Sequence, residues 1–110
     1  MIITNKYVDK WLNLWGAAGQ SHLGFIILLR SDAKNREVTL NHERIHNAQA
    51  RELLIIFWYI LYIGHYLINL VRYREHWKAY KNICFEVEAF ENQKNLSYLN
   101  ERKRFVWLKL

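Results

Sequence analysis

The chain has 110 residues and a mass of 13.4 kDa, which suits a single domain and leaves no room for a second core. Hydrophobic residues make up 52% of it and aromatic residues 15%, which excludes an intrinsically disordered chain. The lone cysteine, Cys84, excludes a secreted disulfide scaffold, and the net charge of +6 suits an anionic partner, either nucleic acid or a lipid surface.

The first third of the chain predicts a short helix and a strand. Apolar residues at helical spacing predict an amphipathic helix over 8–15 that ends at Gly16. The apolar run from Gly24 to Leu29 is too short for a helix and predicts a buried or half-buried strand. After a polar turn, good helix formers predict a helix over 38–51.

The second half of the chain is more strongly helical. Residues 53–71 contain no Lys, Arg, Asp or Glu, and we expect Gly64 to divide this segment into two shorter helices. A basic and aromatic segment follows over 72–81, and helix-like composition returns over 83–100. We expect the tail, 101–110, to fold back onto the domain.

An H-E-x-x-H motif lies within the helix predicted over 38–51. Residues four apart share one face of a helix, so His42 and His46 can bind one Zn²⁺ while Glu43 reaches a water on the metal. Zinc lowers the pKa of such a water to about 7, and Glu43 can then take its proton and pass it to a leaving amine. The motif therefore predicts hydrolytic zinc chemistry.

A catalytic zinc site needs a third protein ligand and one open position. The downstream candidates are His65, His76, Glu86, Glu88 and Glu91. The apolar spacing of the helix over 83–100 does not choose among the three glutamates. The residues alone leave the third ligand open.

A resemblance to known proteins narrows that choice. The motif followed by a Glu-Ala pair on a later helix resembles the gluzincin metallopeptidases, in which the glutamate before the small residue is the third zinc ligand; Glu88–Ala89 is the matching pair. Segments 38–55 and 79–90 also resemble a family of small HExxH proteins, seen in Bacteroidetes, that look like minimal gluzincins. The resemblance runs from about Gly24 to the end of the chain.

The resemblance implies a mainly α (α+β) fold over residues 1–110: a small zincin-like domain with a helical HExxH core and a minor sheet of short strands. It implies a zinc-dependent metallopeptidase in which His42, His46 and Glu88 bind Zn²⁺ and Glu43 is the catalytic base. In zincin-like geometry a strand beside the zinc pairs with an extended peptide substrate, and Gly24–Leu29 is the expected strand. His65, His76 and Tyr80 are candidates for stabilising the oxyanion.

The apolar segment 53–71 has two interpretations. Its length of about 28 Å as a helix would nearly cross a bilayer. A crossing would, however, put His46 and Glu88 on opposite sides of the membrane, so we favour a helix buried in the domain or covered by a second copy, with peripheral membrane association left open. The first residues lack the features of a signal peptide, and we expect a cytoplasmic protein.

Two other functions remain as alternatives. The motif could bind metal without turnover in a membrane-associated protein, or the chain could be a basic helical binding module without metal. No nucleic-acid-binding motif accompanies the basic segment over 72–81, so we expect no nucleic acid partner.

Overall fold

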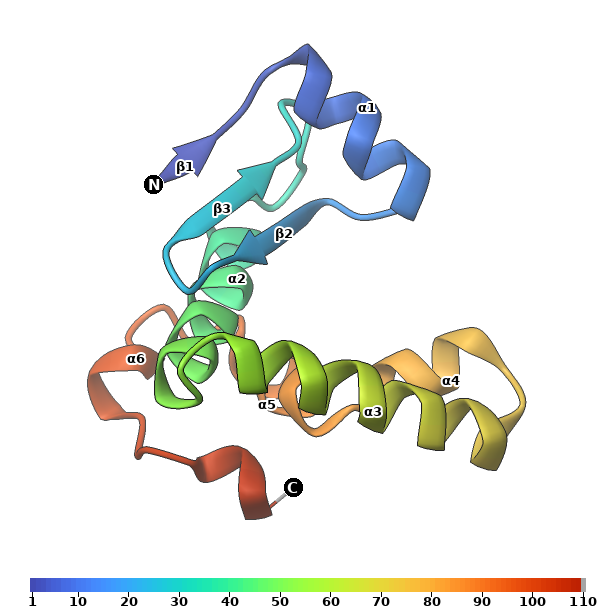
Figure 1. The fold of residues 1–110 in the computed structure, drawn as a ribbon. Coiled ribbons are helices and arrows are strands. Elements are labelled where there is room, and N and C mark those ends of the chain that lie inside the picture. Colours follow the sequence, from blue (N-terminus) through green and yellow to red (C-terminus); the bar gives the residue numbers. More distant parts are fainter. Residues whose placement is uncertain (110) are drawn as a thin grey trace.

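The computed structural model describes residues 1–109 and combines a small sheet with a set of helices (Figure 1). The strands are β1 (Ile2–Ile3), β2 (Gly19–His22) and β3 (Ile26–Leu29). The helices are α1 (Lys6–Trp15), α2 (Arg36–Glu52), α3 (Ile56–Tyr73), α4 (His76–Lys81), α5 (Cys84–Asn92), α6 (Tyr98–Glu101) and the 3-10 helix η1 (Val106–Lys109). Helix accounts for 62% of the chain and the sheet has three strands, which confirms the prediction of a mainly helical domain with a minor sheet.

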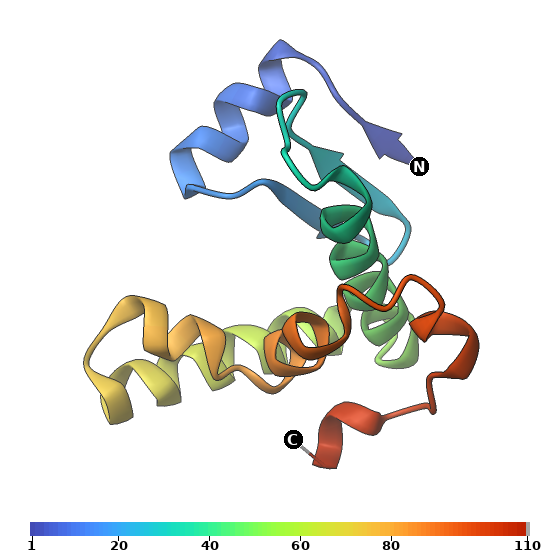
Figure 2. The same ribbon diagram turned by 180° about the vertical axis from the view of Figure 1, so that it is seen from behind.

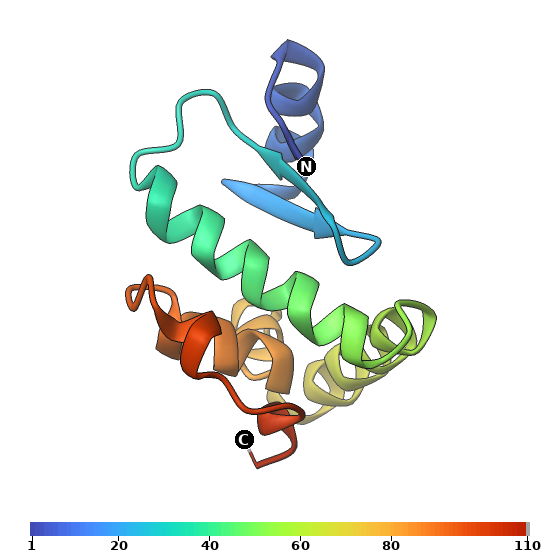
Figure 3. The same cartoon turned by 90° about the vertical axis from the view of Figure 1, so that its left-hand side faces the viewer.

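The sheet is mixed, and the predicted strand lies at its centre. The strand order is β1-β3-β2, with β1 parallel and β2 antiparallel to β3. Hydropathy gives no signal for β2, because its residues are polar or glycine; its pairing with β3 makes it a strand. Figure 3 shows α2 running beneath the sheet, with the remaining helices of the second half on its other side. Helix α2 therefore joins the two layers of the fold.

The break in the helical second half lies between α2 and α3. Gly64 lies inside α3, so the predicted division there is wrong. The chain instead turns by 113° between the two helices, at Leu54 and Ile55, whose φ angles are +54° and +67°. Such angles are costly for residues other than glycine, so this turn is held by its surroundings.

The main apolar core lies between α2, α3 and α5. It contains Ala50, Trp58, Ile83, Phe85 and Trp107. The indole of Trp107 lies edge-on to the ring of Phe85, with the ring centroids 4.9 Å apart. The C-terminal tail thus folds back onto the domain, as predicted. Figure 2 shows the tail from the opposite side, wrapping around α5.

Helix α3 is less buried than expected. Only Trp58 and Asn69 of its residues are fully buried, and most of its aliphatic side chains are exposed. The segment 53–71 is therefore not buried within the single chain, and its covering by a second copy, the other form of the prediction, stays a prediction. Among the residues described, no single helix is long and apolar enough to cross a membrane. The bent pair of α2 and α3, taken together, has the length and composition for a crossing.

Candidate metal centre

The buried side of α2 is unusually polar. Buried polar residues normally need a specific reason, because each must find hydrogen-bond partners away from water. Six of the nine buried residues of α2 are polar: Asn41, His42, Glu43, His46, Asn47 and Gln49. A helix that only supported the core would carry aliphatic residues at these positions. The composition of this face therefore marks it as a site.

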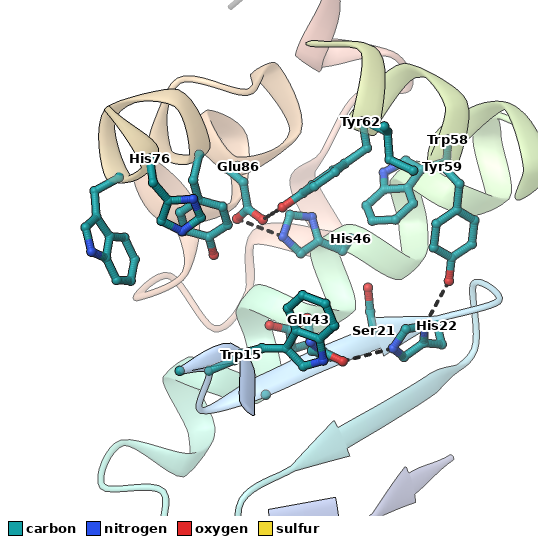
Figure 4. A pocket seen from close by; sticks show the side chains of 17 residues that line it. Trp15, Ser21, His22, Glu43, His46, Trp58, Tyr59, Tyr62, His76 and Glu86 are labelled. Atoms are coloured by element: carbon teal, nitrogen blue, oxygen red, sulfur yellow. Dashed lines mark hydrogen bonds and ion pairs between the residues drawn. The ribbon is translucent and has the colours of Figure 1, made fainter. Parts of the chain in front are cut away.

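His42 and His46 point at one carboxylate oxygen from α5. The Nε2 atoms of the two histidines are 3.1 Å apart, and they lie 2.9 and 3.0 Å from Oε1 of Glu86. All three side chains are buried. Figure 4 shows His46 and Glu86 meeting above Glu43. Three atoms of the kinds that bind zinc thus converge on one point.

The other ring nitrogens of the two histidines are held by glutamines. Nδ1 of His46 lies 2.9 Å from Oε1 of Gln49, and Nδ1 of His42 lies 2.7 Å from Oε1 of Gln93. The amide nitrogen of Gln49 donates to the carbonyl oxygen of Phe85 and to Glu88, which orients its oxygen toward His46. An amide oxygen can only accept, so Nδ1 of each histidine donates to its glutamine and Nε2 is the atom that faces Glu86 and could bind a metal.

Glu86 is also oriented by a hydrogen bond, and its carboxylate is ionised. The hydroxyl of Tyr62 donates to its Oε2, which leaves Oε1 facing the histidines. Burial opposes the charge of Glu86, but His46 and His42 outweigh this effect and hold its pKa well below the usual range. Burial also opposes a charged His46, but the carboxylate of Glu86 outweighs it and raises the pKa of His46 to about 9. The cluster therefore attracts positive charge.

The third member of this cluster differs from the predicted one. The structure places Glu86, rather than Glu88 or Glu91, with the histidines, because residues two apart on a helix lie about 200° apart. The apolar spacing of the predicted helix over 83–100 does not choose among the glutamates; in the structure α5 begins only at Cys84, and both Glu86 and Glu88 are buried, on different sides of the helix. The Glu-Ala pair therefore selected a residue on another face of α5.

Glu88 belongs instead to a buried ion-pair network. Its carboxylate accepts hydrogen bonds from Gln49 at 2.9 Å, from the hydroxyl of Tyr98 at 2.7 Å and from the guanidinium of Arg102. Arg102 also donates to Glu52 at 2.6 Å, near the end of α2. This network ties the C-terminal segment to α2 and, through Gln49, reaches His46.

A cleft of about 390 Å³ opens beside the cluster. Its lining includes Glu43, His46 and Glu86, the strand β2, and aromatic residues from α1, α3 and α4. These aromatic residues are Trp15, Trp58, Tyr59, Tyr62, Trp77 and Tyr80. Trp15 and Trp77 are 62% and 54% exposed, which places them at the rim. The cleft is therefore mostly apolar, with the polar cluster in its wall.

Glu43 faces this cleft next to β2. Gly19 allows β2 to lie close to the side chain of Glu43. A Cβ atom at residue 19 would lie only 3.1 Å from the carbonyl oxygen of Leu28 and 3.4 Å from Cγ of Glu43. Burial raises the pKa of Glu43 above its ordinary value, although His46 and His42 act in the opposite direction. A carboxylate with a raised pKa is suited to taking up a proton near neutral pH.

The remaining predicted site residues divide into two groups. His76 and Tyr80 line the cleft, whereas Nδ1 of His65 accepts a hydrogen bond from the backbone of Cys84 outside it. The predicted substrate strand, Gly24–Leu29, corresponds to β3. Because β3 lies between β1 and β2, both of its edges are already paired with neighbouring strands. The strand that lines the cleft is β2, at the edge of the sheet. The strand beside the cluster is therefore β2 and not the predicted one.

Sequence reasoning did not give roles to several residues around the cluster. Gln49, three residues after His46, could have been found from helical spacing, because it lies on the same face of α2. Nothing local to Gln93, Tyr62 or Arg102 marks these residues, which come from other parts of the chain. No protein-family model, curated protein or solved structure matches this chain, so the likeness to gluzincins stands on the motif residues alone.

Proposed function

We propose that the protein is a zinc-dependent peptidase whose metal is held by His42, His46 and Glu86. The observation that carries the proposal is the convergence of two Nε2 atoms and one carboxylate oxygen beside Glu43 in an open cleft. A ligand set of two histidines and one glutamate with an open position is typical of hydrolytic zinc sites.

The donor atoms fit zinc in kind and in spacing. Tetrahedral coordination with bonds of about 2.0–2.1 Å puts donor atoms roughly 3.3 Å apart. The three separations here, 2.9, 3.0 and 3.1 Å, need to widen by only a few tenths of an ångström. Hydrogen bonds from the histidines to the two glutamines, and from Tyr62 to Glu86, already fix the outer side of each ligand, as is usual for metal-binding residues.

The roles of the other residues follow from their places around the cleft. A bound zinc ion would supply Lewis acidity, which makes a water nucleophilic near neutral pH and polarises a carbonyl group. Glu43 would accept the proton of the attacking water and return it to the leaving amine. Burial raises the pKa of Tyr80, so its hydroxyl stays protonated and can donate to a developing oxyanion.

The cleft also indicates the kind of substrate. Because β2 is an edge strand, it can pair with an extended peptide through main-chain hydrogen bonds. The aromatic wall formed by Trp58, Tyr59 and Tyr62 suits apolar side chains on that peptide. We therefore propose extended peptides with hydrophobic residues next to the cleaved bond.

Metal analysis of purified protein tests the ligand set. We expect about one zinc per chain in the wild type and a large loss of zinc in Glu86→Gln. Glu91→Gln is the matched control, because Glu91 is exposed on the same helix. Wild-type zinc affinity in a folded Glu86→Gln variant would contradict the proposed site.

Hydrolysis of a peptide library tests the activity separately. Glu43→Gln should keep its zinc and lose turnover by about 10²- to 10⁴-fold, the usual contribution of a general acid–base. Hydrolysis that persists in this variant would point to a contaminating enzyme. A wild type that binds zinc but cleaves nothing would instead make the protein a metal-binding protein without turnover.

A further inference from the structure

One face of α3 is exposed and entirely apolar. Its exposed aliphatic and aromatic side chains are between 36% and 79% accessible. They are Ile56, Phe57, Ile60, Leu61, Ile63, Leu67, Ile68, Leu70 and Val71, and together they form the outward face. At 100° per residue these positions cover about half of the helix circumference. Gly64 is the only other residue within this arc.

The polar side chains of α3 between Ile56 and Val71 all turn toward the protein. Tyr59, Tyr62, His65, Tyr66 and Asn69 each form a hydrogen bond with another part of the chain. A helix on the surface of a soluble domain has the opposite arrangement, with its apolar stripe inward and its polar face in water. The reversed polarity of α3 indicates that its outward face meets an apolar environment.

We propose that the outward face of α3 docks on an anionic lipid bilayer. A protein partner would be expected to meet polar groups, because interfaces carry about one hydrogen bond per 100–200 Å². The outward face offers no side-chain donor or acceptor over the 16 residues from Ile56 to Val71. Hydrocarbon is the environment that requires such an absence. The composition of the face therefore favours lipid over a second copy of the chain.

Basic and aromatic residues flank the outward face. Arg51 precedes it, and Arg72 and Arg74 follow it; all three are exposed. Tyr73 and Trp77 lie at the same end as the two arginines, and both are exposed. Lys and Arg bind anionic headgroups, and Trp and Tyr prefer the boundary between headgroups and hydrocarbon. The net charge of +6 acts in the same direction.

The surrounding fold sets the orientation of α3 on the membrane. Helix α3 has 18 residues and a length of about 27 Å. Its inner side packs on α2 and α4, so half of its circumference cannot meet lipid. Helix α3 therefore lies along the surface with the outward face among the upper acyl chains, as in interfacial amphipathic helices.

Co-sedimentation with vesicles tests the proposal, with no need for zinc or turnover. The wild type should bind vesicles of phosphatidylcholine and phosphatidylglycerol, and Ile60→Gln/Leu67→Gln should weaken binding by at least about tenfold. Both residues are more than half exposed, so the variant should fold. Leu14→Gln/Leu96→Gln is the matched control, because these exposed leucines lie outside α3 and should leave binding unchanged.

Three results would overturn the proposal. The first is a wild type that does not bind these vesicles. The second is equal binding by the α3 variant, which would place the lipid contact elsewhere. The third is sedimentation of the wild type as a stable dimer that Ile60→Gln/Leu67→Gln converts to monomer and that persists when vesicles are added, which would assign the outward face to a second copy.

Discussion

Replacing Gln49 with methionine should weaken zinc binding although Gln49 is not a ligand. Its side chain is fully buried and forms four hydrogen bonds: with Nδ1 of His46, with the carbonyl oxygen of Phe85, with Glu88 and with the indole of Trp58. Methionine has a similar length but forms none of these bonds. The imidazole of His46 would lose the partner that fixes its tautomer and ring orientation.

The magnitude follows from the number of bonds lost. Leaving a buried polar group unsatisfied costs about 1–3 kcal/mol, so two or three such groups should lower the free energy of unfolding by roughly 2–9 kcal/mol. Loss of a partner behind a metal ligand typically weakens metal binding by about 10- to 100-fold. Both effects should appear together in Gln49→Met.

Two measurements separate these effects. Thermal denaturation reports the loss of stability, and competitive titration with a zinc chelator at low temperature reports the affinity of the folded protein. Gln93→Met is the informative companion, because Gln93 holds Nδ1 of His42 by a single bond and is only half-buried. It should lose zinc affinity with little loss of stability. A folded Gln49→Met variant with wild-type zinc affinity would refute the role assigned to this glutamine.

Three further outcomes are expected. Arg102→Met should lower the free energy of unfolding by about 3–5 kcal/mol in chemical denaturation, because it leaves two buried carboxylates without their partner; the exposed Arg104→Met should have little effect. Leu54→Gly should raise the melting temperature by roughly 4 °C, because Leu54 is exposed and has a φ of +54°, whereas Leu61→Gly, inside α3, should lower it. Zinc at 100 times its dissociation constant should stabilise the wild type by about 2.7 kcal/mol in calorimetry, and stabilisation of Glu86→Gln by the same concentration would argue against the ligand set.

The sequence located the helix that carries the two histidines and Glu43 because the relevant information is local. Helical spacing alone puts His42 and His46 on one face, with Glu43 between them. The same holds for β3, because its short apolar run between polar or glycine-containing segments already predicts a strand. Such features depend on neighbours within a few residues, and hydropathy and spacing describe these neighbours well.

The third member of the cluster was harder to predict because it depends on how α5 is rotated about its own axis, here called its phase. A shift in where the core face is centred changes which glutamate points at the histidines. The phase is set by long-range packing: Phe85 lies in the main core and Glu88 is bound by Arg102. Neither contact can be read from the spacing of residues within α5.

Two further features could not be predicted from the sequence: the turn between α2 and α3, and the strand β2. Neither Gly nor Pro marks the residues Leu53–Ile55, so nothing in their sequence predicts a sharp turn there. The residues of β2 have no alternation of apolar and polar side chains, and the strand is set by its pairing with β3 and its contact with α2. Tertiary structure overrides local preference in both places.

Ile63 connects the two proposals, because it belongs to the outward face of α3 and also lines the cleft. A chain held at a bilayer through this face would present the rim of its cleft to the membrane surface. Peptide segments anchored in the same membrane would then reach the cleft by diffusing in two dimensions, at an effective concentration set by the membrane rather than by the bulk solution. A weak affinity of the cleft for each anchored segment would then be sufficient for binding. Soluble peptides of the same sequence would compete poorly for the cleft.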